Sequence, residues 1–106
     1  MNYFQDKAVY ITGGSSGIGL SAAKQLASYG AHVAISARGQ ERLQTALALV
    51  KAAAKSPGQR FVAISADVAN PADCARAVKE TVDGLGHCDV VIANAYPPRV
   101  DPPVIS

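Results

Sequence analysis

Short apolar runs alternate along the chain with longer segments in which apolar residues recur every three or four positions. The runs are four to six residues long and rich in β-branched side chains. Runs without polar alternation are typical of strands that are buried on both faces. We therefore predict four strands, at residues 8–11, 32–37, 61–65 and 89–93.

Three helices are predicted between these runs. Their apolar stripes are Ile18, Ala22 and Leu26; Leu43, Leu47, Val50 and Ala54; and Ala75, Val78, Val82 and Leu85. Gly30 suits a left-handed helix end, and the turn residues 56–58 close the second helix. The third helix has the clearest start, because Asn70 can cap its first turn, Pro71 fits its first position and Asp73 suits its dipole.

The order of these elements predicts an α/β fold. Parallel strands joined by right-handed helical crossovers, at about 30 residues per unit, account for residues 7–93. We expect a Rossmann-type doubly wound parallel sheet with strand order 3-2-1-4, truncated after its fourth strand, over residues 1–95, and an irregular proline-rich tail over 96–106. Ligands bind such sheets at the carboxyl ends of the strands, so functional residues should directly follow them.

A glycine-rich turn, Thr12-Gly13-Gly14-Ser15-Ser16-Gly17-Ile18-Gly19, follows the first predicted strand. Such a turn lets backbone N–H groups approach a pyrophosphate at the positive end of the next helix. Gly13 would form the tight turn, Gly17 would leave room for phosphate, and Gly19 would let the helix pack closely on the sheet. A purely structural turn is the alternative. An ATP-binding P-loop is disfavoured, because Leu20 stands where that loop needs its lysine.

These eight residues resemble the cofactor turn of the short-chain dehydrogenases/reductases, whose pattern is Thr-Gly-x-x-x-Gly-x-Gly. The resemblance implies hydride transfer between a nicotinamide dinucleotide and a ketone or alcohol. The cofactor contacts that it implies in this turn are Thr12, Gly13, Ser15, Ser16, Gly17, Ile18 and Gly19.

The residues that close the second strand favour NADP(H). In the family an acidic residue at this point holds the adenosine ribose of NAD, and a following basic residue favours the 2′-phosphate of NADP. Ala37 takes the acidic position here and Arg38 follows. A guanidinium binds phosphate through paired hydrogen bonds, whereas Ala37 offers nothing to a ribose diol. A solvated loop cation is the structural alternative for Arg38.

The resemblance implies further contacts after the third and fourth strands. An aspartate at the position of Asp67 accepts a hydrogen bond from the adenine amino group, and Val68 lines the adenine slot, although Asp67 could also serve as a turn former. Asn94 matches the second asparagine of the family's Asn-Asn-Ala-Gly, which ties neighbouring strands together and contributes to the active-site water network. Asn94 is therefore the catalytic candidate, and Tyr96 departs from the pattern where the family has glycine.

The family's carbonyl-polarising serine and its Tyr-x-x-x-Lys pair have no counterpart after Asn94. Tyr3 and Lys7 have the right spacing but precede the first strand, at the amino end of the sheet, and we interpret them as coincidence. Residues 96–106 hold four of the six prolines, which excludes a helix or a central strand. We expect a truncated or frame-shifted reductase that is inactive alone.

Within the family, the chain resembles the 3-ketodihydrosphingosine reductases, on residues 11–19, the pair 37–38 and the long second helix followed by 56–60. This likeness implies a keto-lipid substrate, although many other ketoreductases share these features. Eukaryotic members of that group carry a membrane segment ahead of the first strand. The residues ahead of the first predicted strand here do not resemble one, so we expect a soluble bacterial version. The alternative function is a non-enzymatic nucleotide-binding or association module.

Composition and charge exclude several classes of protein and of binding partner. A chain of 106 residues with 49% hydrophobic and 17% charged residues suits one soluble domain. A net charge of +2 gives no reason to expect a nucleic-acid partner. No segment resembles a signal peptide or reaches the roughly 18 to 20 apolar residues that span a bilayer, so a cytoplasmic protein is expected.

The remaining polar residues indicate neither a metal nor a disulfide. Cys74, Cys88, His32 and His87 lack metal-ligand spacing, and we expect structural roles for them and a reducing compartment. A sheet that stops after its fourth strand leaves an edge and apolar faces uncovered, which predicts association, as in a homo-oligomer.

Overall fold

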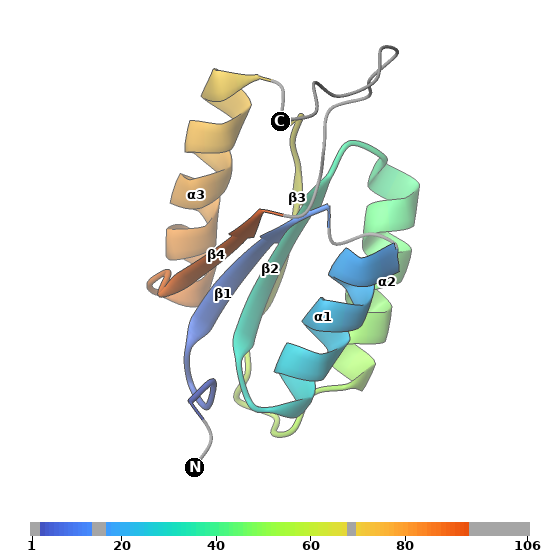
Figure 1. The fold of residues 1–106 in the computed structure, drawn as a ribbon, viewed down its shortest axis with the longest axis vertical. Helices are drawn as coiled ribbons and strands as arrows, with labels where there is room; N and C mark the ends of the chain where they lie inside the picture. Colours follow the sequence, from blue (N-terminus) through green and yellow to red (C-terminus); the bar gives the residue numbers. More distant parts are fainter. Residues whose placement is uncertain (1–2, 14–16, 68–69, 94–106) are drawn as a thin grey trace, which may run out of the picture.

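The computed structural model describes residues 3–13, 17–67 and 70–93. Its elements are β1 (Ala8–Thr12), α1 (Gly17–Ser28), β2 (His32–Ala37), α2 (Gln40–Ala52), β3 (Phe61–Ser65), α3 (Pro71–Leu85) and β4 (Val90–Ala93). The four strands are parallel and lie in the order β3-β2-β1-β4 (Figure 1). The predicted α/β fold and strand order are therefore confirmed.

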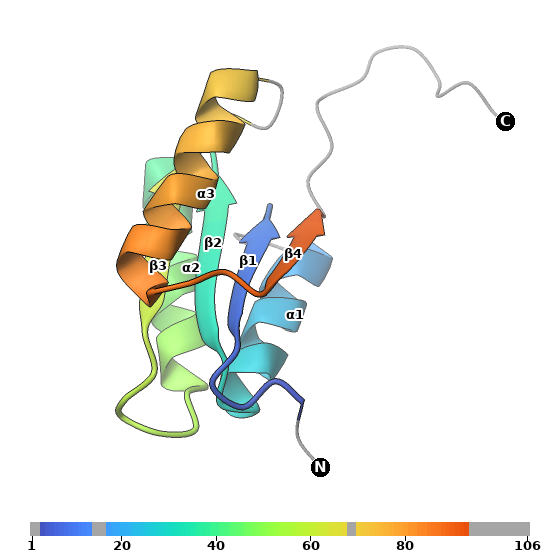
Figure 2. The same ribbon diagram turned by 90° about the vertical axis from the view of Figure 1, so that its left-hand side faces the viewer.

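The sheet is covered on both faces, which explains why its central strands carry no polar alternation. Helices α1 and α2 lie on one face and α3 on the other (Figure 2). Val9 and Ile11 of β1 pack with α1 and α2, whereas Tyr10 packs with α3. Neighbouring side chains of β1 thus enter two separate cores, and both cores are apolar.

The helix ends follow the predicted signals. Gly30 has φ +95° and closes α1, and Gly86 does the same for α3 with φ +93°. Asn70 caps α3, because its Oδ1 accepts hydrogen bonds from the N–H groups of Ala72 and Asp73. The end of α2 is a difference from the prediction: the helix stops at Ala52, ahead of Ala54.

Two of the predicted apolar stripes are wrong in part. In α3 the buried residues are Ala77, Thr81 and Leu85, whereas Val78 and Val82 are each 40% exposed. The helix packs on β3, β2 and β1, and its small residues let it lie close to the sheet. In α1 the predicted core residue Ile18 is 80% exposed, because the buried face of the helix is formed by Gly19, Ala23, Leu26 and Ala27.

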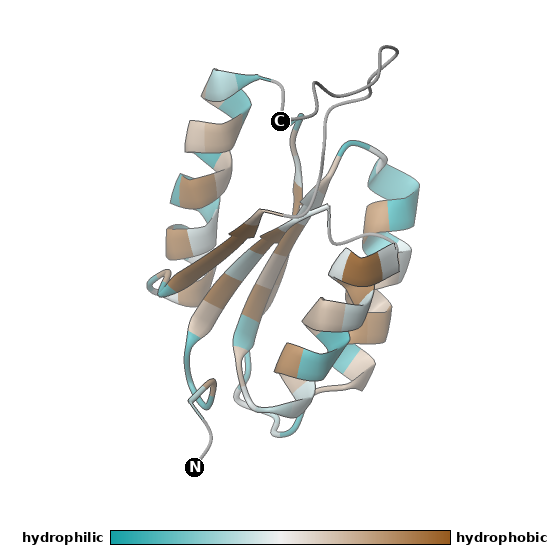
Figure 3. Ribbon diagram, in the orientation of Figure 1, coloured by the Kyte–Doolittle hydropathy of each residue, from teal (hydrophilic) through white to brown (hydrophobic). Residues whose placement is uncertain are grey.

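Strand β4 keeps an apolar, partly uncovered surface (Figure 3). Val91 pairs in register with Tyr10 and so lies on the face of the sheet that carries α3, but it is 54% exposed. Helix α3 covers the other three strands and has no contacts with β4 among the described residues. This exposure agrees with the apolar surface expected from the sequence.

The loops at the amino end of the sheet are joined through one side chain, that of Gln59. Its Oε1 accepts hydrogen bonds from the N–H groups of Lys55 (2.7 Å) and Ser56 (2.8 Å). Its Nε2 donates to the carbonyls of Ala27 (2.8 Å) and Ala31 (2.7 Å). Gln59 therefore connects the last turn of α1 and the α1–β2 loop with the α2–β3 loop.

Close approach of α3 to β3 requires glycine at position 84. A Cβ on Gly84 would overlap the Cγ2 atom of Val62. We expect Gly84→Ala to lower the free energy of unfolding by about 1 kcal/mol, because overpacking costs typically 1–3 kcal/mol and the higher helix propensity of alanine returns about 1. Urea denaturation would measure the change. Gly58→Ala is the control, since a Cβ there meets nothing within 4 Å; an unfolding free energy of Gly84→Ala at or above that of the control would contradict the packing argument.

Candidate functional site

The sequence-predicted site residues that the structure describes lie at the carboxyl ends of the strands. Thr12 ends β1 and Gly13 follows it, Arg38 directly follows β2, and Asp67 comes two residues after β3. Because the strands are parallel, these ends share one edge of the sheet, as the arrowheads of β1, β2 and β4 show (Figure 2). Ser15, Ser16, Val68 and Asn94 lie outside the described residues, as does the tail from 96 to 106.

The glycine turn has the conformation for which glycine is needed. Gly13 has φ +71° and Gly17 has φ +60°, in the left-handed region. The Gly13 N–H donates to the Ser36 carbonyl at 2.8 Å, which ties the turn to β2. Among the described residues, no atom lies within 4 Å of a Cβ built on Gly17, so there is open space beside it. Gly19 is buried inside α1.

Hydrogen bonds between polar side chains and neighbouring strands connect β1 with β2 and β4 near this edge. The Thr12 hydroxyl donates to the Ile92 carbonyl of β4 at 3.5 Å. The hydroxyls of Tyr10 and Ser36 share a buried hydrogen bond of 2.8 Å between β1 and β2. Burial raises the pKa of Tyr10, against the opposite effect of the Ser36 bond. Tyr10 therefore stays a neutral, structural phenol.

A cavity at the carboxyl end of β2 is bordered by the start of α2. The cavity, of about 640 Å³, is lined by Gly39, Gln40, Glu41, Arg42 and Thr45. Arg38 is exposed beside it, and in the described part of the chain no ion pair involves its guanidinium. Gly39 caps α2 without a side-chain hydrogen bond, which leaves the first N–H groups of the helix to other partners. The positive helix end and the guanidinium favour an anion here, against the opposite effect of the Glu41 carboxylate in the cavity lining.

The loop after β3 is held by hydrogen bonds at Asp67. The Asp67 N–H donates to the Asp73 carboxylate at 2.9 Å, and the Asp67 carbonyl accepts from the Asn70 N–H at 2.9 Å. The bond from the Asp67 backbone is the main reason that the pKa of Asp73 is lowered. The sequence pattern predicted Asp73 as a partner of the helix dipole, but its bond to Asp67 had no local sequence signal.

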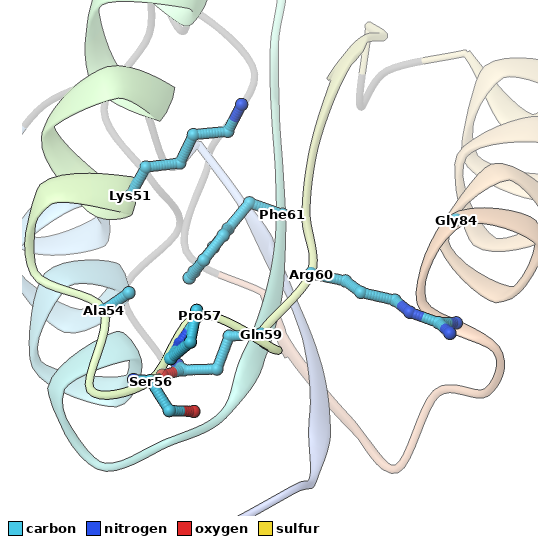
Figure 4. A pocket seen from close by; sticks show the side chains of 8 residues that line it. All are labelled: Lys51, Ala54, Ser56, Pro57, Gln59, Arg60, Phe61 and Gly84. Carbon is cyan, nitrogen blue, oxygen red and sulfur yellow. Dashed lines mark hydrogen bonds between the residues drawn. The ribbon is translucent and has the colours of Figure 1, made fainter.

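A second cavity, of about 520 Å³, lies at the amino end of β3 (Figure 4). It is lined by Lys51, Ala54, Ser56, Pro57, Gln59, Arg60, Phe61 and Gly84. The Arg60 side chain points toward Gly84 of α3, whereas Lys51 and Phe61 lie on the α2 side (Figure 4). The two cations therefore do not converge on one ligand.

The described residues outside this edge bear on the sequence-based expectations for a Tyr-Lys pair, a metal site and a membrane span. Tyr3 and Lys7 precede β1, and the Lys7 Nζ lies 5.1 Å from the centre of the Tyr3 ring. They are at the amino edge, away from the glycine turn. No group of three His, Cys, Asp or Glu side chains within 3–13, 17–67 and 70–93 could hold a metal, and Cys74 and Cys88 are free thiols. No helix in these segments has the length and apolarity to cross a bilayer.

The chain is similar to known proteins along most of its length. A family model described as short chain dehydrogenase matches residues 7–100. A 3-ketodihydrosphingosine reductase of Aspergillus fumigatus is 40% identical over 85 residues, which are 77% of this chain and 23% of that protein. An L-rhamnose 1-dehydrogenase (NAD(P)(+)) of a Sphingomonas species is 38% identical over 96 residues, covering 90% of this chain and 36% of the relative.

Solved structures agree with these matches. A short chain dehydrogenase from Burkholderia cenocepacia in complex with NADP superposes with a TM-score of 0.78 at 40% identity, over 89% of this chain and 37% of that one. A short-chain dehydrogenase/reductase from Serratia marcescens gives a TM-score of 0.76 at 36% identity, over 86% of this chain and 36% of that one. The chain thus spans between about a quarter and two fifths of the length of these relatives.

Proposed function

The chain belongs to the short-chain dehydrogenase family, and on this premise we propose that it binds NADP(H) across the carboxyl ends of β1, β2 and β3. Arg38 carries the proposal. It is exposed at the end of β2, beside the cavity at the start of α2, and Ala37 offers no carboxylate to a ribose diol. The NADP bound to the Burkholderia relative supports the same choice of dinucleotide.

Each part of the cofactor has a proposed partner in this chain. The pyrophosphate lies against the turn from Thr12 to Gly19, where Gly13 and Gly17 take left-handed conformations and the space beside Gly17 is open. Ser15, Ser16 and Ile18 complete that contact. Arg38 binds the 2′-phosphate through paired hydrogen bonds. Asp67 and Val68 hold the adenine ring, and Asn94 belongs to the reaction centre.

The activity of the whole protein is proposed to be reduction of a ketone to an alcohol. A bound nicotinamide dinucleotide supplies the hydride for such a reaction. The relatives are named for substrates as different as 3-ketodihydrosphingosine and L-rhamnose, and their shared chemistry is a carbonyl–alcohol pair. Two of the relatives are 3-ketodihydrosphingosine reductases, at 40% and 44% identity, so a keto-lipid is the first substrate to test.

Titration of the full chain with both dinucleotides tests the proposal. We expect NADPH to bind roughly 10 to 100 times more tightly than NADH, because a hydrogen bond to a charged group contributes about 1.5–3 kcal/mol. Isothermal titration calorimetry gives both constants. Equal affinities would contradict the assignment of Arg38, and binding of neither would contradict the cofactor site itself. Oxidation of bound NADPH in the presence of a keto-lipid would contradict the alternative of a non-enzymatic nucleotide-binding module, because hydride transfer needs a complete reaction centre.

A further inference from the structure

The loop that follows β3 is fixed by a carboxylate from the next helix. Asp73 lies in the first turn of α3, and its Oδ2 accepts a hydrogen bond from the Asp67 N–H at 2.9 Å. The Asp67 carbonyl is bonded to the Asn70 N–H at 2.9 Å. Both backbone groups of Asp67 are thus held, so its carboxylate can be redirected only by the two torsions of its short side chain.

Arg76 extends this arrangement to the end of β3. Its guanidinium donates to the Ser65 carbonyl at 2.7 Å, lies 3.5 Å from Asp73 Oδ1 and pairs with Glu80. Arg76 therefore binds Ser65, the last residue of β3, and Asp73 binds Asp67, which lies two residues later in the loop. The carboxylate of Asp73 is the group that touches both Asp67 and Arg76.

The network is too exposed to serve mainly as a stabilising device. The side chains of Asp73 and Arg76 are 30% and 45% exposed. Ion pairs at such positions contribute little to stability. The hydrogen bonds nevertheless have well-defined partners on β3, on the loop and on α3, which is the pattern of a positioning role.

We infer that Asp73 is a positioning residue for base recognition, holding Asp67 so that its carboxylate accepts a hydrogen bond from the amino group of adenine. This inference rests on the proposed function, in which Asp67 lines the adenine site. By this inference, Asp73 makes the site selective for a purine whose 6-position carries a hydrogen-bond donor. The charged form of Asp73 makes this bond, in agreement with its lowered pKa.

Comparison of two dinucleotides that differ only in the base tests the inference. Reduced nicotinamide hypoxanthine dinucleotide phosphate carries a carbonyl where NADPH carries the amino group, so a carboxylate there would face an acceptor. We expect the parent chain to bind NADPH about tenfold more tightly than the hypoxanthine form. In Asp73→Ala this ratio should fall to about one. Asp73→Asn keeps an acceptor oxygen and should give an intermediate ratio.

Asp83→Ala is the matched control, because Asp83 lies on the same helix and pairs only with Lys79, at 3.7 Å, among the described residues. It should keep the parent ratio. A parent ratio in Asp73→Ala, or in Asp73→Asn if the alanine variant does not fold, would overturn the inference while NADPH binding stands. A parent chain that binds NADPH without discriminating the base would overturn it too. A parent chain that binds neither dinucleotide would overturn the proposed function together with it.

Discussion

Replacing Arg38 with aspartate is expected to reverse the cofactor preference, lowering the affinity for NADPH by roughly a hundredfold or more. The change removes a charge-assisted contact worth about 1.5–3 kcal/mol and places a carboxylate where the 2′-phosphate would lie. The same carboxylate can accept hydrogen bonds from a ribose diol, so NADH affinity should rise. Calorimetric titration of the parent and the variant with both dinucleotides measures the reversal.

Arg60→Asp is the control for this charge change. Arg60 is also exposed, but it lies at the amino end of β3, and its side chain points toward α3 (Figure 4). This variant should keep the parent preference for NADPH. If Arg38→Asp binds NADPH as tightly as the parent chain, the 2′-phosphate has another partner and the argument from the end of β2 fails.

Replacing Gln59 with alanine is expected to lower the free energy of unfolding by about 2–4 kcal/mol. The substitution removes four hydrogen bonds to backbone groups of α1 and two loops, each worth about 0.5–1.5 kcal/mol. Domains of this size have total stabilities of about 5–15 kcal/mol, so the thermal midpoint should fall by roughly 10 °C or more. Calorimetric or circular-dichroism melting curves measure the shift.

Two further variants isolate the role of the Gln59 amide. Gln59→Glu should be at least as destabilising as alanine, because a carboxylate oxygen would replace the donor that faces the carbonyls of Ala27 and Ala31. Gln44→Ala should be nearly neutral, since Gln44 is exposed on α2 and has no side-chain hydrogen bond in the described part of the chain. A melting curve of Gln59→Ala that matches that of Gln44→Ala would contradict the prediction.

Local signals were sufficient to predict most of the fold. The apolar runs predict the strands to within one residue at their ends. In β1 and β2 the reason is burial on both faces, which leaves no alternation of polar and apolar residues. Asn70 and Gly30 mark helix ends through backbone requirements that belong to the residue itself. The strand order follows from the usual arrangement of such crossovers and is confirmed.

Features that depend on distant neighbours were not predicted correctly. The stripe Val78 and Val82 is the more apolar side of α3, but the helix turns its small residues toward the sheet, where Gly84 meets Val62. The contacts of Gln59 reach the α1–β2 loop, and no local pattern marks them. Within the site, the glycine turn and the end of β2 were identified from the sequence, whereas the bond between Asp73 and Asp67 became visible only in three dimensions.

The position of β1 has a consequence for how the chain acquires its structure. Of the four strands β1 is synthesised first, yet it occupies the interior of the sheet, between β2 and β4. One side of β1 can pair as soon as β2 is synthesised, but the other must wait for β4, near the end of the described chain. Pairing across such long sequence separations slows folding, and it leaves a hydrogen-bonding edge open to nascent neighbours until synthesis reaches β4.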